Sequence, residues 1–122
     1  MQNRYQIEDD IKRQTTPLYR APEQIDLYSG LPITEKVDVF ALGCLIYTLL
    51  FFRSPFDADL TLEHAAARYK LPINANISQG MQALISRCLE VDPRRRVSST
   101  DLWSQLDYLR QMSQNASQVP QV

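Results

Sequence analysis

The side chains of this chain that could do chemistry are few, and each also has an ordinary structural explanation. His64 is the only histidine, and it falls off the apolar stripe of a short predicted helix, which favours a surface position over a metal-binding or catalytic role. Cys44 and Cys88 lie in apolar runs far apart, so we expect buried free thiols in a reducing compartment rather than a disulfide. The basic run 94–96 could bind a phosphate, but so short a run is more typical of a solvated turn with one anchored arginine.

Ligands that need a glycine-rich loop or a strong surface charge are disfavoured. The three glycines, Gly30, Gly43 and Gly80, cannot form G-x-G-x-x-G or G-x-x-x-x-G-K-[ST], so no loop of those kinds cradles a nucleotide phosphate. Thirteen basic and fourteen acidic side chains give a net charge of −1, so we expect no nucleic-acid partner and no general attraction to anionic membranes. Residues 1–5 open no apolar segment, so we expect no signal peptide.

The element that must position any site is a long apolar helix predicted over residues 34–52. Thr34 is a plausible N-cap, and residues 39–52 are apolar almost without interruption, which is typical of a helix buried on every face. A membrane span is the rival interpretation. The apolar run is shorter than the ~20 residues that a span needs. A central buried helix is therefore the prediction.

The remaining segments predict one helical domain. Periodic apolar residues and capping residues predict shorter helices at about 22–29, 59–69, 78–89 and 99–112. Residues 1–16 are polar and are predicted to be a loop or a mobile arm. The tail 113–122 is predicted to be disordered. No segment alternates as a strand does.

Four short motifs follow one another in the order that protein kinases have them. Residues 16–23 read T-P-L-Y-R-A-P-E, which resembles the end of a kinase activation segment, T-x-x-Y-x-A-P-E. Residues 38–43 (D-V-F-A-L-G) are similar to D-x-W-S-x-G, residues 54–56 (S-P-F) to x-P-F, and residues 89–96 (L-E-V-D-P-R-R-R) to L-x-x-D-P-x-x-R. The resemblance implies an all-α fold: a partial kinase C-lobe, consisting of the end of the activation segment and the helices that follow it, packed on the helix at 34–52.

The resemblance also divides the chain. It implies a partial kinase domain at 1–112, in which residues 1–21 are a remnant of the activation segment with the P+1 loop and residues 22–112 are C-lobe helices. Residues 25–36 read I-D-L-Y-S-G-L-P-I-T-E-K, and this stretch is the part most similar to the Numb-associated kinases, the group of the adaptor-associated and cyclin-G-associated kinases. One departure is Ala67, where those kinases tend to have glycine, so we expect the third helix to end differently here.

Membership of that group implies a function for a longer parent protein. The parent would be a cytoplasmic, vesicle-associated serine/threonine kinase that transfers phosphate from Mg-ATP to protein substrates and is linked to clathrin-mediated endocytosis. The P+1 loop, which contacts the residue after the phosphoacceptor, would consist of Thr16, Pro17, Leu18, Tyr19 and Arg20.

Three further roles are implied by position in the motifs. Thr16 would place its hydroxyl beside the catalytic aspartate. Glu23 and Arg96 would form a buried ion pair that ties the A-P-E segment to the turn before the last helix. Asp38 would accept backbone N–H bonds from the catalytic loop in the parent, and would be exposed or unsatisfied where that loop is absent.

The motifs that carry out phosphotransfer are not in this sequence. It has no glycine-rich loop, no V-A-I-K lysine, no H-R-D and no D-F-G, which the family uses to hold Mg-ATP and to activate the acceptor hydroxyl. We therefore expect no catalytic residue, metal site or cofactor in this chain, and no activity from it alone. The alternative function is a non-catalytic interaction module that keeps the substrate-docking face. A membrane anchor through residues 39–52 is the weakest hypothesis.

Overall fold

The computed structural model describes residues 4–14, 17–28, 30–56, 62–72 and 76–118. Every regular element in this part of the chain is a helix, so the predicted all-α fold is confirmed. The elements are α1 (Arg4–Gln14), the 3₁₀ helix η1 (Pro17–Tyr19), α2 (Pro22–Ile25), α3 (Lys36–Phe51), α4 (Leu62–Ala65), α5 (Gln79–Cys88) and α6 (Ser99–Gln118).

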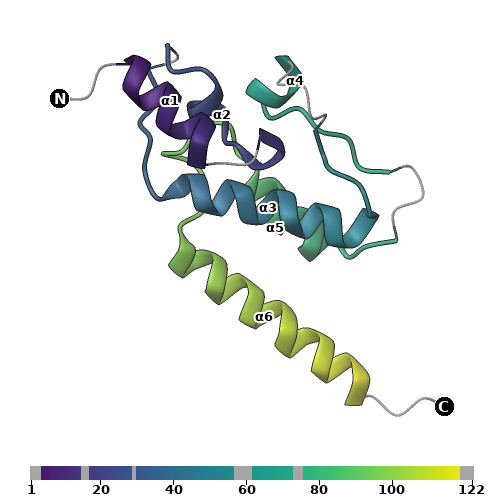
Figure 1. Cartoon of the computed structure of the whole chain (residues 1–122). Coiled ribbons are helices and arrows are strands. Elements are labelled where there is room, and N and C mark those ends of the chain that lie inside the picture. The colour runs from purple at the N-terminus through teal and green to yellow at the C-terminus, as the bar shows by residue number, and fades with distance from the viewer. Residues whose placement is uncertain (1–3, 15–16, 29, 57–61, 73–75, 119–122) are drawn as a thin grey trace.

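Helix α3 is the centre of the fold, as predicted. In Figure 1, α3 and α5 lie together in the middle of the molecule, with α1, α2 and α4 on one side and α6 on the other. Helices α3 and α5 approach closely at Gly43, where a Cβ atom would lie 2.6 Å from the Cβ of Cys88. The core is formed by buried side chains of these two helices and their flanks, among them Phe40, Cys44, Tyr47, Leu84, Ile85 and Leu89.

The prediction that α3 is buried on every face is wrong for one stripe. Leu42, Leu45 and Leu49 are 37%, 43% and 67% exposed. These residues lie three or four positions apart, so they share one face of the helix. The described elements pack on the other faces of α3 and leave this one open to solvent.

Both ends of the chain are more helical than predicted. Residues 4–14 form α1 instead of a loop or mobile arm, and the pairing of Asp9 with Arg13 one turn apart (3.1 Å) explains part of its stability. Helix α6 begins at Ser99, directly after Ser98, whose hydroxyl accepts from the N–H of Asp101 (3.1 Å), and continues to Gln118. Neither glycine nor proline interrupts residues 99–118, so nothing stops this helix at residue 112.

The short helices near the A-P-E motif differ from their predicted lengths in the opposite direction. Helix α2 ends at Ile25 because Asp26 has an extended backbone and its carboxylate accepts from the N–H of Tyr28 (3.0 Å). Helix α4 is a single turn that ends at Ala65. Two residues later Ala67 takes a left-handed conformation (φ 51°), which stops the helix well before the predicted end at residue 69.

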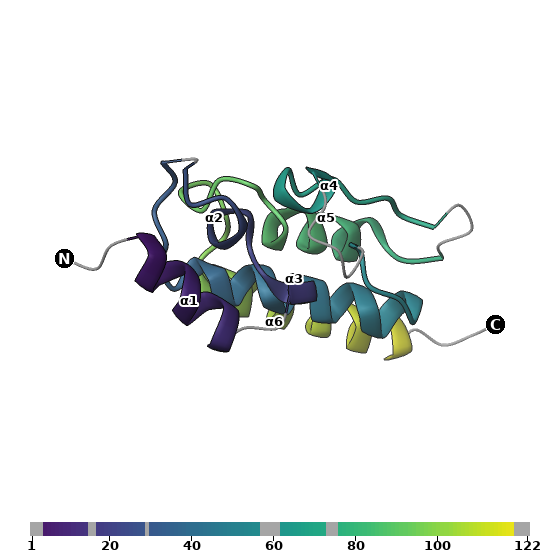
Figure 2. The same ribbon diagram turned by 45° about the horizontal axis from the view of Figure 1, so that its top comes forward.

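Figure 2 shows α2 and α4 on the same side of α3, and the two short helices contact each other. The loop that precedes α2 therefore lies between α4 and the central helix. None of the described helices is both long enough and apolar enough to cross a membrane.

Candidate functional site

The predicted P+1 loop runs into the start of α2. Thr16 lies outside the described residues, and Pro17 begins η1. Leu18 is half-buried, and Tyr19 is a half-buried side chain that packs on the core cluster around Phe40. Arg20 is 6% exposed, so the loop turns inward before A-P-E begins.

Glu23 and Arg96 are brought together by the fold across 73 residues of sequence. The two guanidinium nitrogens Nη1 and Nη2 donate to the two carboxylate oxygens of Glu23 at 2.8 and 2.9 Å. Both side chains are fully buried. This is the paired, bidentate geometry that two buried charges require. The contact joins the first turn of α2 to the turn that precedes α6.

The other N–H groups of Arg96 are also used. Nε donates to the Glu90 carbonyl (2.9 Å), Nη1 also to the Lys36 carbonyl (2.9 Å), and Nη2 also to the Val91 carbonyl (3.3 Å). All five donors of the guanidinium therefore have an acceptor. The Cζ atom lies 5.0 Å from the centroid of the Phe40 ring, where a cation is attracted by the ring electrons.

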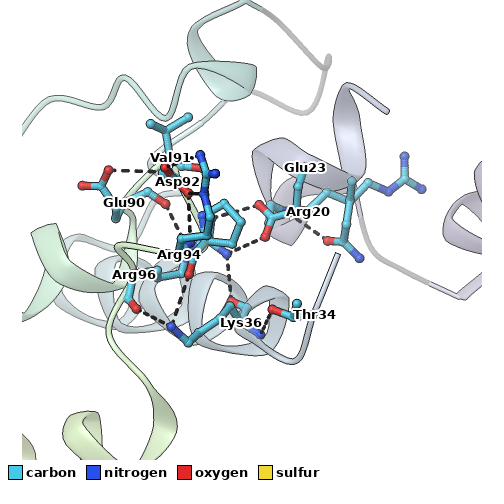
Figure 3. Close-up of polar contacts among 12 residues, drawn as sticks. Arg20, Glu23, Thr34, Lys36, Glu90, Val91, Asp92, Arg94 and Arg96 are labelled. Carbon is cyan, nitrogen blue, oxygen red and sulfur yellow. Dashed lines mark hydrogen bonds and ion pairs between the residues drawn. The ribbon is translucent and has the colours of Figure 1, made fainter. Parts of the chain in front are cut away.

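Lys36 completes this network, and sequence reasoning missed it. Its ammonium group donates to the carbonyls of Pro93 (3.2 Å) and Arg96 (2.6 Å), while Arg96 donates to the Lys36 carbonyl. Figure 3 shows Lys36 reaching from α3 toward the turn that carries Arg96, with Glu23 approaching Arg96 from α2. We call Glu23, Lys36 and Arg96 the charged anchor. The position of Lys36 two residues before Asp38 was visible in the sequence, but nothing in it indicated a partner.

The three consecutive arginines have different surroundings. Arg94 pairs with Asp92 through two hydrogen bonds of 3.0 Å, and its side chain is 68% exposed. Hydrogen bonds from Arg94 lower the pKa of Asp92. Arg95 is exposed, and only Arg96 is buried. The run is thus a turn with one anchored arginine.

The prediction of a surface position for His64 is wrong. The ring is fully buried, stacks on Phe56 (centroids 4.5 Å apart, planes 2° apart) and lies 6.4 Å from Phe40. Its Nε2 is 2.7 Å from the carbonyl oxygen of Arg20, which can only accept, so Nε2 carries a proton. Burial lowers the pKa of His64. We call Phe40, Phe56 and His64 the aromatic anchor.

Two other groups of residues singled out from the sequence belong to neither anchor. Asp38 is exposed on the first turn of α3. Cys44 and Cys88 are buried free thiols, and burial raises the pKa of Cys44 to about 12 and of Cys88 to about 11, so neither is reactive as a thiolate. The described residues contain no group of three or more His, Cys, Asp or Glu placed to hold a metal ion.

The arrangement can hold a loop but brings no nucleophile and base together. One end of the segment 20–23 is held by the aromatic anchor and the other by the charged anchor. Residues immediately before it, Leu18 and Tyr19, are thereby presented at the edge of the core. Positioning of the short segment that precedes α2 is what this geometry supports.

Comparison with known proteins agrees with the motifs. Residues 4–108 match the family model described as the protein kinase domain. Two probable serine/threonine-protein kinases of Dictyostelium discoideum are 44% and 43% identical over 115 and 110 residues, which are 94% and 90% of this chain. Actin-regulating kinase 1 of Saccharomyces cerevisiae is 35% identical over 104 residues, 85% of this chain.

The chain spans only a small part of these relatives: 14% and 10% of the two Dictyostelium proteins and 16% of the yeast protein. The matched residues include both anchors and the segment between them. The helical fold, the order of the motifs and the match to residues 4–108 agree with one another. The chain therefore belongs to the protein kinase family, of which it forms part of the helical C-lobe.

Proposed function

We propose that this chain is the substrate-facing part of the C-lobe of a serine/threonine kinase of the Numb-associated type. In the parent, the γ-phosphate of Mg-ATP would pass to a serine or threonine hydroxyl of a protein substrate. The observation that carries the proposal is the buried Glu23–Arg96 pair, because it fixes the start of α2 and with it the segment 18–21 just before it. The names of the Dictyostelium relatives support the serine/threonine class.

The chain alone is proposed to be inactive. Its residues do not fit Mg-ATP in the manner of the family, since the sequence lacks the glycine-rich loop, the strand lysine, H-R-D and D-F-G. The role left to its own residues is to shape the surface on which the acceptor peptide lies. Purified chain mixed with Mg-ATP and a serine/threonine peptide should therefore give no phosphopeptide, and Mg-ATP-dependent phosphorylation free of contaminating kinase would contradict this.

A chimaera tests the substrate-facing role. Residues 15–112 replace the equivalent segment of a complete Numb-associated kinase, and kcat is measured on a serine/threonine peptide. Thr16→Ala should lower kcat by about a hundredfold or more, because a polar group beside the catalytic base is lost. Thr15→Ala is the matched control and should change little. A loss below about threefold for Thr16→Ala, with normal thermal stability, would show that Thr16 has another role.

The cellular part of the proposal rests on the I-D-L-Y-S-x-x-P-I-x-E-K resemblance. The parent would be cytoplasmic and would act at clathrin-coated vesicles. The yeast relative is named an actin-regulating kinase. Fluorescently tagged parent protein should colocalise with clathrin-coated structures. A uniform distribution would contradict this part and leave the kinase assignment intact.

A second function is favoured by one observation: the segment 20–23 is held entirely by residues of this chain. The chain could thus act as a non-catalytic interaction module that presents the same face. Titration of the chain with the peptide that the chimaera phosphorylates separates the two functions. Binding by the chain supports the module, and no binding at millimolar peptide contradicts it.

A further inference from the structure

His64 is a buried titratable group to which neither the proposed catalysis nor the ion pair assigns a role. It is the last residue but one of α4, and its Nε2–H donates to the carbonyl of Arg20, 44 residues earlier in the chain. This hydrogen bond links α4 directly to the segment before A-P-E. The neutral ring fits the site because two phenylalanine rings lie parallel to it.

Three elements of the described part of the chain pack on the ring, and one of them carries a charged side chain that acts on it. Helix α3 contributes Phe40, the loop after α3 contributes Phe56, and the segment before α2 contributes Arg20. The Arg20 guanidinium acts on His64 and repels a second positive charge on the ring. The Arg20 carbonyl favours the cation, but the loss of solvent on burial is the larger effect, so the pKa of His64 is lowered.

A second proton would therefore favour conformations in which the ring reaches water. The ring cannot leave its stack without breaking the bond to the Arg20 carbonyl. Opening thus separates α4 from the segment before A-P-E. The charged anchor lies at the other end of that segment and keeps its own contacts, so the opening is local.

We propose that neutral His64 holds the segment 18–21 against α4 and that mild acidification releases it, which makes this chain a pH-sensitive presenter of its substrate-facing loop. The proposal goes beyond the proposed function, since it concerns the conformation of the loop and holds whether or not a parent kinase is active.

The direction and size of the effect follow from proton linkage. Above the ordinary histidine pKa of 6.5, both closed and open forms are neutral and the closed form is stable. As pH falls below that value the open form gains a proton first, and the opening constant rises by up to about tenfold at about pH 5.5. The rise ends only when the closed form is also protonated, at a lower pH.

The first measurement uses the fact that the chain has a single histidine. Its imidazole ¹H–¹³C resonances in an NMR titration of the full chain report on His64 alone. We expect a pKa below 6.5, together with a neutral ring protonated at Nε2 at neutral pH. A pKa at or above 6.5 would overturn the proposal, and this measurement needs no variant.

The second measurement is amide hydrogen exchange, expressed as protection factors at about pH 7.5 and about pH 5.5. The N–H of Ala21 bonds to the Gln24 side chain and that of Ala67 to the His64 carbonyl, so these amides report on the two sides of the contact. The N–H of Leu89, bonded to the Ile85 carbonyl, is the internal control. Protection at Ala21 and Ala67 should fall by up to about tenfold relative to Leu89.

His64→Gln is the matched variant, because glutamine keeps a side-chain N–H donor but does not titrate. In this variant the ratio of protection at Ala21 and Ala67 to that at Leu89 should not depend on pH. Three results would each overturn the proposal. Protection could fall as much in His64→Gln as in the original chain, it could fall equally at all three amides, or it could fail to fall in the original chain.

Discussion

The segment 20–23 is held at its two ends by anchors of different chemistry. The charged anchor uses two cations and one carboxylate, and every N–H of its guanidinium has an acceptor. The aromatic anchor joins the segment through one hydrogen bond from a ring stacked on phenylalanine. Both cross long stretches of sequence, 73 and 44 residues.

The difference shows how one segment can be fixed at one end and adjustable at the other. Buried opposite charges are costly to separate, because removing one partner leaves the other buried without a counter-charge. A histidine can gain charge near physiological pH, so its contact can be opened without a mutation. The charged anchor fixes the last residue of the segment, Glu23, and the aromatic anchor sets how firmly its first residue, Arg20, is held.

The largest expected effect comes from breaking the charged anchor. Arg96→Ala leaves the buried Glu23 carboxylate without its partner and should lower the free energy of unfolding by about 3–5 kcal/mol. Urea denaturation followed by circular dichroism measures this. Arg94→Ala is the matched control, because the Arg94 side chain is 68% exposed and its partner Asp92 is only partly buried, and it should cost less than about 1 kcal/mol.

A second pair of variants keeps this prediction testable if Arg96→Ala does not fold. The double change Glu23→Leu with Arg96→Met removes both charges and should be more stable than either single change, because no buried charge is left alone. If Arg96→Ala lowered the free energy of unfolding no more than Arg94→Ala does, the pair would not stabilise the fold. The same conclusion would follow if the double variant were less stable than both of its single variants.

Removing Lys36 from the same anchor should have a smaller effect. Lys36→Met keeps the apolar stem but loses two hydrogen bonds from a partly buried ammonium group, so we expect a loss of about 1–2 kcal/mol. Lys70→Met is the control at an exposed lysine and should be close to neutral. Equal denaturation midpoints for the two variants would mean that the ammonium of Lys36 adds no stability.

The pH dependence of stability tests the aromatic anchor. The lowered pKa of His64 means that its contribution is complete above pH 6.5 and is lost as pH falls toward the pKa of the folded state. The original chain should therefore lose up to about 1.4 kcal/mol more than His64→Gln between about pH 7.5 and about pH 5.5. Urea midpoints of both proteins at the two pH values check this, and parallel losses would contradict it.

The smallest expected effect is a gain of stability at the end of α4. Ala67 has φ 51°, a conformation that favours glycine, so Ala67→Gly should raise the free energy of unfolding by about 0.5–1 kcal/mol. Ala66→Gly, one residue earlier and without a positive φ, should lower it by a similar amount. Thermal denaturation of the two variants gives shifts of opposite sign if the backbone is as described.

The sequence predicted best where one local pattern decides the structure. The spacing of Met81, Leu84, Ile85 and Cys88 predicted α5, and the Ser78 hydroxyl does accept from the N–H of Met81 (3.1 Å). The uniform apolar run predicted α3. In both helices the hydrophobic pattern is a property of the segment itself, so neighbouring sequence was enough. The cap was predicted correctly for α5 only: the prediction of Thr34 as N-cap of α3 is wrong, since Glu35 takes that position and makes no side-chain cap hydrogen bond.

The position of His64 could not be predicted in the same way. An eleven-residue helix at 59–69 would place the histidine off its apolar stripe. Residues 59–61 lie outside the described part of the chain; within it, α4 is the single turn Leu62–Ala65 and the chain turns left-handed at Ala67. The ring is then oriented by Phe56 and by the Arg20 carbonyl, which are distant in sequence or outside the helix. The length of α1 was missed for a related reason, since its polar sequence carries only weak local signals such as the Asp9–Arg13 pair.

Phe40 has a consequence for how this domain can change during evolution. Its ring receives the Arg96 guanidinium at 5.0 Å and stacks with Phe56 at 5.9 Å, so one side chain is shared by both anchors. Substitutions at residues 64 and 96 are therefore not energetically independent, although 32 positions separate them in the sequence. A substitution that changes the size of the side chain at position 40 alters which residues are tolerated at positions 64 and 96. The order in which such substitutions are acquired then matters.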